Sequence, residues 1–228
     1  MKKYAIIVAG GSGTRMGSNL PKQFMLLKGK PVIYHTIKTF LEAYDDMQII
    51  LVLPAEYSDI GQQIIDAYLD KSRIRTTAGG DTRFQSVKNG LALVEEESVV
   101  FVHDGVRCLL SRDLIHRCFE KAVENGTAIP AVVSRDSIRL LDSNDSKAYD
   151  RNKVMLLQTP QTFQSNILLP AFKTEYRKEF TDEATVVEAS GIKVSLIEGE
   201  ENNIKITTPV DMLIAEKILD GRNPVSGL

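Results

Sequence analysis

The sequence predicts an α/β fold, with a mostly parallel sheet, helices on both faces of that sheet and one projecting β-hairpin. Short runs of β-branched residues alternate with longer stretches of helical periodicity along most of the chain, which is typical of this class. Most of the short runs are continuously apolar, as expected of strands that helices cover on both faces. We therefore expect a Rossmann-like arrangement that occupies residues 1–228 as a single domain.

Six runs are predicted to be strands because apolar and β-branched residues dominate them. In chain order they are Tyr4–Ala9, Met47–Leu53, Ile74–Thr77, Val99–His103, Ala128–Val133 and Lys193–Ile197. Four intervening stretches are predicted to be helices. The first begins after Pro31, the second carries an apolar stripe from Phe84 to Val94, Ser111 caps the third, and Thr208-Pro209-Val210-Asp211 starts the fourth.

The segment from Ser134 to Asp150 breaks the alternation, because charged residues replace the apolar pattern and Ser143-Asn144-Asp145-Ser146 reads as a turn. It predicts a projecting hairpin with strands at about 137–141 and 153–157. Residues 134–157 would then form a β-arm outside the layered core. An arm of this kind needs a partner surface.

Composition excludes several classes of function. The chain has 28 basic and 30 acidic residues and a net charge of −2, so no broad positive field favours nucleic acid or an anionic membrane. Its longest apolar runs fall far short of the ~18 residues that a membrane-spanning helix needs. Two cysteines, Cys108 and Cys118, are too few for a zinc site or a disulfide framework. We expect a cytoplasmic protein.

A glycine-rich loop, Gly10-Gly11-Ser12-Gly13-Thr14-Arg15-Met16-Gly17, follows the first predicted strand directly. Glycines let backbone N–H groups approach a phosphate, and open α/β sheets bind ligands where a strand ends. The loop is not a Walker A loop, which needs Gly-x4-Gly-Lys-Ser/Thr, and Met16 stands where the dinucleotide fingerprint needs its third glycine. The loop therefore predicts a nucleotide phosphate site of another kind.

Two cations accompany this loop: Arg15 within it and Lys22 shortly after it, in Pro21-Lys22-Gln23. Taken singly, each could be an ordinary solvated surface charge. Together beside a glycine-rich cradle they suit a triphosphate that is being cleaved, because charge builds on its oxygens. They are our first candidates for catalytic residues.

Five blocks together resemble the cytidylyltransferases, and most closely the 2-C-methyl-D-erythritol 4-phosphate cytidylyltransferase family of the non-mevalonate isoprenoid pathway. The blocks are Gly10–Gly17 with Pro21-Lys22-Gln23, Gly79–Val87, Val102–Arg107, Gln158-Thr159-Pro160-Gln161 and Asn203–Thr207. They fall in the family's order from residue 4 to about residue 215. The resemblance therefore covers nearly the whole chain.

This resemblance implies a nucleotidyltransferase. The phosphate of a polyol phosphate attacks the α-phosphorus of CTP in line, pyrophosphate leaves, and Mg²⁺ bridges the phosphates. No protein nucleophile is needed, so catalysis consists of positioning and charge stabilisation. By similarity Arg15, Lys22 and Lys205 gather around the reacting phosphates as the catalytic residues. Nucleotide-binding positions, again by similarity, are Ala9, Gly10, Gly11, Gly80, Asp81 and Ser86.

Acceptor binding is expected near Asp104 and Arg107. Asp104 closes a predicted strand and offers hard oxygen atoms to Mg²⁺ or to substrate hydroxyls. After the arginine the family normally has a proline, where this chain has Cys108, which leaves the turn less rigid. His103 is expected to be structural, because an ionised phosphate has no proton for a base to remove.

The resemblance also gives the arm a purpose. In the family such an arm embraces a second subunit, and the arginine matching Arg151 reaches the acceptor phosphate in the neighbour's active site. Ser137 and Thr159 supply further hydroxyl candidates for that phosphate. A homodimer is therefore expected. The alternative for Arg151 is a surface ion pair of little energetic value.

Two other functions fit parts of the pattern. A ribitol-5-phosphate cytidylyltransferase looks very similar through the nucleotide half, although three segments resemble the methylerythritol group better: Arg135-Asp136-Ser137, Asp150-Arg151-Asn152 and Phe180–Ala184. A non-catalytic nucleotide-binding module could share the fold, because fold does not establish activity. Uridylyl or adenylyl transfer also stays open, since base choice depends on backbone contacts.

Overall fold

The computed structural model describes residues 1–11, 20–142 and 145–222. Within these ranges one eight-stranded sheet has the strand order β10-β7-β11-β6-β1-β4-β5, with β12 paired to β7. Its strands are β1 (Lys2–Val8), β4 (Met47–Leu53), β5 (Ile74–Ala78), β6 (Ser98–Asp104), β7 (Thr127–Val133), β10 (Met155–Leu157), β11 (Gln161–Gln164) and β12 (Leu196–Glu198). The pairs β1–β4, β1–β6, β4–β5 and β7–β12 are parallel, whereas β11 runs antiparallel between β6 and β7.

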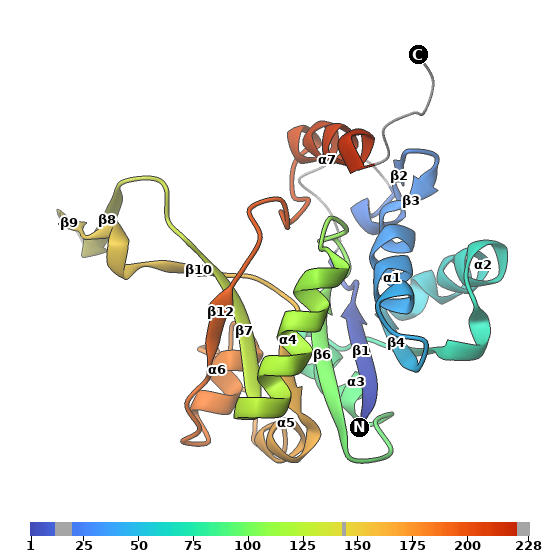
Figure 1. Ribbon diagram of the computed structural model, residues 1–228, viewed down its shortest axis with the longest axis horizontal. Coiled ribbons are helices and arrows are strands. Elements are labelled where there is room, and N and C mark those ends of the chain that lie inside the picture. Colours follow the sequence, from blue (N-terminus) through green and yellow to red (C-terminus); the bar gives the residue numbers. More distant parts are fainter. Residues whose placement is uncertain (12–19, 143–144, 223–228) are drawn as a thin grey trace.

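Helices cover both faces of this sheet (Figure 1). They are α1 (Val32–Ala43), α2 (Ser58–Tyr68), α3 (Arg83–Leu91), α4 (Arg112–Asn125), α5 (Ser165–Ala171), α6 (Glu183–Glu188) and α7 (Pro209–Arg222). The predicted fold class is confirmed. Helices α1 and α4 pack on one face, and α3 and α5 pack on the other.

The strand sequences explain this two-sided core. Side chains alternate between faces along a strand, so Ala5 and Ile7 of β1 join the cluster beneath α1 and α4, while Tyr4 and Ile6 join the cluster beneath α3. All four are buried. A strand with both faces covered must be apolar at every position, which is why these runs show no polar alternation.

Helix boundaries follow the expected capping chemistry. The Ser111 Oγ accepts a hydrogen bond from the Leu114 N–H at 3.0 Å, as predicted, and Thr82 Oγ1 does the same for the Gln85 N–H at 3.0 Å. Pro31 precedes α1, and Gly126 ends α4 at φ 84°, a conformation that glycine adopts without strain. At the start of α7, the Asp211 side chain reaches back to the two residues that precede the helix: its Oδ2 accepts from the Thr207 and Thr208 N–H groups, each at 2.7 Å.

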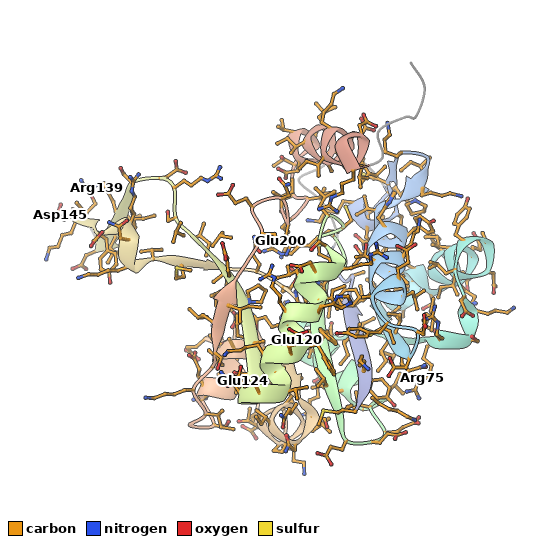
Figure 2. All side chains as sticks on the ribbon, viewed as in Figure 1. Arg75, Glu120, Glu124, Arg139, Asp145 and Glu200 are labelled. Atoms are coloured by element: carbon orange, nitrogen blue, oxygen red, sulfur yellow. The ribbon has the colours of Figure 1, made fainter. Side chains whose placement is uncertain are left out.

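The arm differs in part from the prediction. Its hairpin pairs β8 (Ile138–Asp142) with β9 (Asp145–Tyr149), and Figure 2 shows Arg139 and Asp145 at its far end, away from the layered body. The expected second strand, 153–157, is wrong as a hairpin partner, because Met155–Leu157 forms β10 and pairs with β7 instead. Strand β7 belongs to the eight-stranded sheet, so these residues pair with the large sheet and not with the two-stranded hairpin.

Several exposed apolar side chains lie on this arm and at its base, as others do on α7. Leu141 is 86% exposed and Leu140 52%, and Leu156 of β10 is 50% exposed. Both cysteines, in contrast, are buried, and both are free thiols. Among the helices of the three described ranges, none is long and apolar enough to cross a membrane.

One short strand pair and several further elements were not predicted. Strands β2 (Leu26–Leu27) and β3 (Lys30–Pro31) form a small hairpin before α1. Strand β11 and helices α2, α5 and α6 were also missed. The missed β11 matters for the site, because it brings the Gln158–Gln161 block beside the end of β6.

Candidate active site

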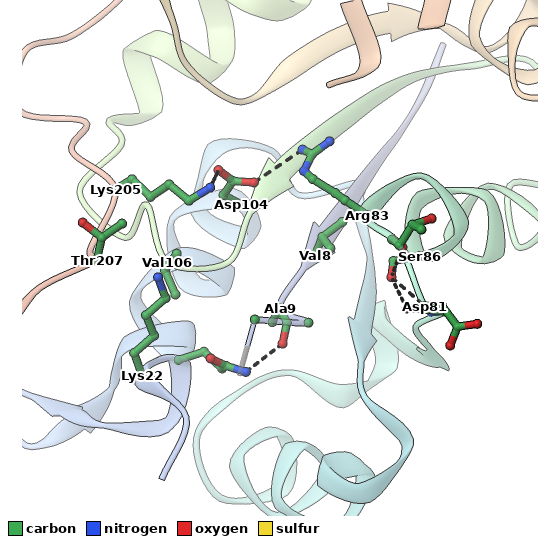
Figure 3. A pocket seen from close by; sticks show the side chains of 15 residues that line it. Val8, Ala9, Lys22, Asp81, Arg83, Ser86, Asp104, Val106, Lys205 and Thr207 are labelled. Carbon is green, nitrogen blue, oxygen red and sulfur yellow. Dashed lines mark hydrogen bonds and ion pairs between the residues drawn. The ribbon is translucent and has the colours of Figure 1, made fainter. Parts of the chain in front are cut away.

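A cavity of about 590 Å³ opens at the carboxyl ends of β1 and β6, where parallel strands of an open sheet present their ligand sites. Five separate parts of the chain line it, and Figure 3 shows Lys22 and Lys205 on one side with Asp81 and Ser86 on the other. The lining residues are Val8, Ala9, Gly10, Gly11, Lys22, Gln23, Gly80, Asp81, Thr82, Arg83, Ser86, Asp104, Val106, Lys205 and Thr207. Most of the sequence-predicted site residues therefore meet here.

The end of β1 fixes the first wall. The Gly105 N–H donates to the Val8 carbonyl at 2.8 Å, and a Cβ at Gly105 would lie 2.6 Å from Ile33 Cδ1 and 3.1 Å from Ala9 Cβ. A side chain at this position would displace the end of Ile33 and press on Ala9, so glycine suits the close approach of β1 and the loop after β6. The buried Gln23 donates from Nε2 to the Ala9 carbonyl at 2.8 Å, and this bond holds the neighbouring Lys22 at the cavity.

The opposite wall is the turn that leads into α3. The Gly80 N–H donates to Ser86 Oγ at 3.1 Å, and that hydroxyl donates to the Thr82 carbonyl at 3.0 Å. These bonds close the turn on itself, so Gly80, Asp81 and Ser86 reach the cavity as one rigid unit. The turn presents backbone groups and small polar side chains, which suits recognition of a base edge.

Asp104 lies at the floor of the cavity among three cations. Its Oδ1 is 3.4 Å from Arg83 Nη2, while its Oδ2 is 3.0 Å from Lys205 Nζ and 3.5 Å from Arg107 Nε. Burial on its own would raise the pKa of Asp104, but the charges of the three cations outweigh it and hold this pKa below the ordinary range. Asp104 is therefore ionised, and it holds cationic side chains in place at the cavity.

Lys205 reaches this floor because its segment is tied down on both sides. Asn203 Nδ2 donates to the Thr159 carbonyl at 2.8 Å, Arg107 Nη1 donates to the Asn203 carbonyl at 2.8 Å, and the Ile206 N–H donates to the Val106 carbonyl at 3.0 Å. Arg107 itself is absent from the cavity wall. It lies behind that wall and fastens the Lys205 segment to the loop after β6.

His103 and Thr159 form a buried support beneath Asp104. His103 Nε2 lies 3.1 Å from the Arg107 carbonyl, which can only accept, so this nitrogen carries the proton and Nδ1 accepts from Thr159 Oγ1 at 3.0 Å. The same Thr159 oxygen accepts from the Asp104 N–H at 3.1 Å. Burial lowers the pKa of His103 to about 4, so the ring is neutral and structural, in line with the sequence interpretation.

Four predicted site residues within the described ranges do not line the cavity: Arg107 and Thr159 lie behind its wall, and Ser137 and Arg151 lie on the arm and its base. Ser137 and Arg151 are exposed on the arm and its base, and Arg151 Nη1 donates to the Arg135 carbonyl at 2.7 Å. Neither contributes to the cavity wall of this chain. Arg15 lies outside the described residues.

Sequence reasoning missed Arg83, which follows the Gly80–Asp81 turn at the start of α3. It lines the cavity and pairs with Asp104, and a second pair joins it to the buried Glu183. Its position within the Gly79–Val87 block was a usable signal, because a cation two residues after Asp81 opens α3 at the cavity. Glu183 stands in the Phe180–Ala184 segment that resembles the family, but no local pattern connects it with Arg83, which lies 100 residues earlier in the chain.

Comparison with known proteins agrees with this geometry. The sequence profile of the 2-C-methyl-D-erythritol 4-phosphate cytidylyltransferase family matches residues 4–221. Relatives of that name from Bacteroides thetaiotaomicron and Bacteroides fragilis are 47% and 46% identical, over 96% of this chain and 100% of theirs.

Solved structures give the same relationship. The 4-diphosphocytidyl-2C-methyl-D-erythritol synthase from Anaerococcus prevotii superimposes with a TM-score of 0.82 at 29% identity, covering 96% of this chain and 98% of that one. The 2-C-methyl-D-erythritol 4-phosphate cytidylyltransferase from Thermus thermophilus has a TM-score of 0.75 at 28% identity, with the same coverage. Sequence and structure therefore point to one family.

Proposed function

The chain belongs to the 2-C-methyl-D-erythritol 4-phosphate cytidylyltransferase family, and from this premise we propose how its cavity performs the reaction. The protein is a nucleotidyltransferase that transfers CMP from CTP to 2-C-methyl-D-erythritol 4-phosphate. A phosphate oxygen of the acceptor forms a bond to the α-phosphorus of CTP, and the bond from that phosphorus to the oxygen bridging the β-phosphorus breaks. The products are 4-diphosphocytidyl-2-C-methyl-D-erythritol and pyrophosphate.

One observation carries the proposal: Lys22, Arg83 and Lys205 come from distant parts of the chain and line the same cavity. Phosphoryl and nucleotidyl transfer need positive charge around the reacting phosphorus, and a preorganised donor typically contributes about 10²–10³ in rate. Lys22 and Lys205 are our candidates for this role. Arg15 belongs with them by resemblance and remains a prediction.

The turn at Gly80, Asp81 and Ser86, together with Ala9, Gly10 and Gly11, is our candidate for the cytidine half of the site. Cytosine differs from uracil in its exocyclic amine, which needs an acceptor such as a backbone carbonyl or a hydroxyl oxygen. The Ser86–Gly80 and Gln23–Ala9 hydrogen bonds support this assignment, because they fix both walls before any base arrives.

A divalent cation accompanies the nucleotide in this proposal, and we assign it to Mg²⁺. Asp81 and Asp104 are the carboxylates of the cavity wall, and the described residues contain no cluster of three or more metal-ligating side chains. This donor set fits a cation held by one carboxylate and by nucleotide phosphates, the usual arrangement for Mg²⁺. Asp104 would hold it through an oxygen that it shares with the surrounding cationic side chains, and the bound cation would neutralise charge on the triphosphate.

We place the acceptor next to Asp104, with Arg107 and Thr159 supporting that side of the cavity from behind. Ser137 and Arg151 would then act on a second copy of the chain, in a homodimer joined through the arm. The exposed Leu140, Leu141 and Leu156 support this arrangement, because an arm with such a surface gains stability by burying it.

The reaction can be tested with CTP, Mg²⁺ and each of two acceptors, by following pyrophosphate. We expect release with 2-C-methyl-D-erythritol 4-phosphate and at least about 100-fold less with ribitol 5-phosphate, as expected where a site's polar groups lose their partners. Release with ribitol 5-phosphate alone would replace the proposal by its rival. CTP binding without release with either acceptor would indicate a non-catalytic module, and UTP and ATP serve as controls for base choice.

A further inference from the structure

A buried carboxylate lies behind the cavity wall and belongs to no function described so far. Glu183 is the first residue of α6, and its side chain is 1% exposed. Its Oε1 pairs with Arg83 Nη1, and its Oε2 has no hydrogen-bond partner among the described residues. A carboxylate in such a place costs stability unless its partner compensates for the lost hydration.

Stability alone does not account for this residue. Helix α6 already has its own start, because Asp182 Oδ1 accepts from the Thr185 N–H at 2.9 Å and Thr185 Oγ1 donates back to the Asp182 carbonyl at 2.8 Å. The Gln161 side chain of β11 adds two hydrogen bonds, each of 2.8 Å. Its Nε2 donates to Asp182 Oδ2, and its Oε1 accepts from the Ala184 N–H. Glu183 is therefore not needed to cap or dock the helix.

What Glu183 does is hold Arg83. One nitrogen of the Arg83 guanidinium pairs with Glu183 and another lies 3.4 Å from Asp104 Oδ1, so the arginine bridges two carboxylates. With Oδ1 engaged in this way, Asp104 Oδ2 is left to Lys205 and Arg107. Figure 3 shows Arg83 reaching Asp104 across the back of the cavity, with Lys205 on the far side of the same carboxylate.

We propose that Glu183 is a positioning residue for the nucleotidyl transfer, which acts by anchoring Arg83 and, through it, the Asp104–Lys205 pair. The proposal rests on the proposed function and adds a residue that does not touch the cavity. Without the anchor, the Arg83 guanidinium is free to turn toward the nucleotide phosphates, and Asp104 loses the partner that fixes its orientation. Small displacements of groups around a reacting phosphorus cost rate more than binding.

The first test is Glu183→Gln, which keeps the shape of the side chain and removes its charge. We expect kcat to fall about 10–100-fold, while KM for CTP changes less than about threefold, because the Gly80–Ser86 turn keeps its own hydrogen bonds. Thr185→Val is the matched control: it weakens the start of the same helix without touching Arg83. It should lower the melting temperature and leave kcat unchanged.

A double-mutant cycle then separates anchoring from an independent role. If Glu183 acts only through Arg83, the pair Glu183→Gln with Arg83→Gln turns over no more slowly than Arg83→Gln alone. If the double variant instead lost kcat by the product of the two single losses, the proposal would be overturned. A wild-type kcat for Glu183→Gln, or an equal loss of kcat in Thr185→Val, would overturn it as well.

A measurement on the wild-type protein covers the case in which Glu183→Gln does not fold. In ¹⁵N-arginine NMR the guanidinium protons of Arg83, assigned by their loss in Arg83→Lys, should exchange with solvent much more slowly than those of the exposed Arg112. Equal exchange rates would refute the anchor. If the wild-type protein released no pyrophosphate, the proposed function would fail, while this measurement would still decide whether Arg83 is anchored.

Discussion

The cavity and the arm are built in opposite ways. Around the cavity the polar side chains are matched within the chain: Gln23 with Ala9, Ser86 with Gly80, and Asp104 with three cations. On the arm, apolar side chains such as Leu140 and Leu141 face outward. A single chain thus holds the proposed nucleotide site in place by itself, whereas the arm has a surface that a second molecule would cover.

This difference separates two parts of the proposed catalytic site. The groups for the nucleotide can be tested in any preparation of the chain. Groups on the arm, Ser137 and Arg151, can act only if another copy receives them. Experiments that affect one region and spare the other therefore test the comparison directly.

Replacing a cavity cation should have the largest effect. We expect Lys22→Ala to lower kcat/KM by about 10²–10³, or about 2.7–4 kcal/mol of transition-state stabilisation, because a preorganised charge at the triphosphate is lost. Lys28→Ala is the control, since Lys28 lies nearby in sequence but pairs with Asp220 on the surface, and it should change the rate less than about twofold. Near-wild-type turnover of Lys22→Ala would refute the assignment.

Mixing two inactive variants tests whether the arm completes the site of a partner. Lys22→Ala and Arg151→Ala protomers, each strongly impaired alone, should recover about a quarter of wild-type activity after exchange of subunits, because half the dimers are mixed and one site of each is intact. The measurement is pyrophosphate release before and after mixing. No recovery in verified heterodimers would place Arg151 in its own chain's site.

A matched arm variant strengthens that experiment. The Arg139 guanidinium is satisfied within the hairpin, with Nε donating to Ser146 Oγ at 2.8 Å. The Arg139→Ala variant should therefore be active by itself, before it is mixed with any other variant. A loss as large as that of Arg151→Ala would mean that the arm tolerates no change of charge, and that Arg151 has no specific role.

The buried support of the cavity predicts a pH effect on stability. The pKa of His103 is about 4 in the folded protein against about 6.5 unfolded, so the folded state disfavours the protonated ring. The stability this residue contributes is fully present above pH 6.5 and is lost as pH falls toward 4, by roughly 3 kcal/mol. Urea unfolding across this pH range should show that the free energies of unfolding of wild type and His103→Gln converge at low pH. A difference between the two that stays constant with pH would contradict the neutral ring.

The smallest effect concerns the two cysteines, whose reactivity measures how often the packed core opens to solvent. Burial raises the pKa of the Cys108 and Cys118 thiols to about 12. Neither should react with a thiol reagent at pH 8 in the native protein, and both should react in denaturant. Rapid reaction of Cys108 would show that the loop after β6, where the family normally has a proline, opens readily.

Elements with strong local patterns were predictable from the sequence. The run Met47–Leu53 was predicted with the bounds that β4 has, and Ser111 caps α4 as expected. Strand β11 was missed because it is four residues long and its pairing partners lie far away along the chain. Helix α2 could have been found, because Ile60, Ile64 and Ile65 lie on one of its faces.

The site divides in the same way. Lys22 and the glycines after β1 could be read from one loop, because phosphate-binding chemistry has a local pattern there. Lys205 carried no such pattern and came only from resemblance. Arg83 and Glu183 show the limit of a sequence: their pairing joins α3 to α6 across 100 residues, and only the folded chain brings them together.

The most direct test of the central claim is a crystal structure with Mg²⁺ and a CTP analogue that cannot be cleaved between its α- and β-phosphates. The account predicts phosphate oxygens within about 4 Å of Lys22 Nζ and Lys205 Nζ, the distance range of an ion pair, with the base against the Gly80–Ser86 turn. A nucleotide bound elsewhere, or in this cavity with both lysines turned away from its phosphates, would contradict it.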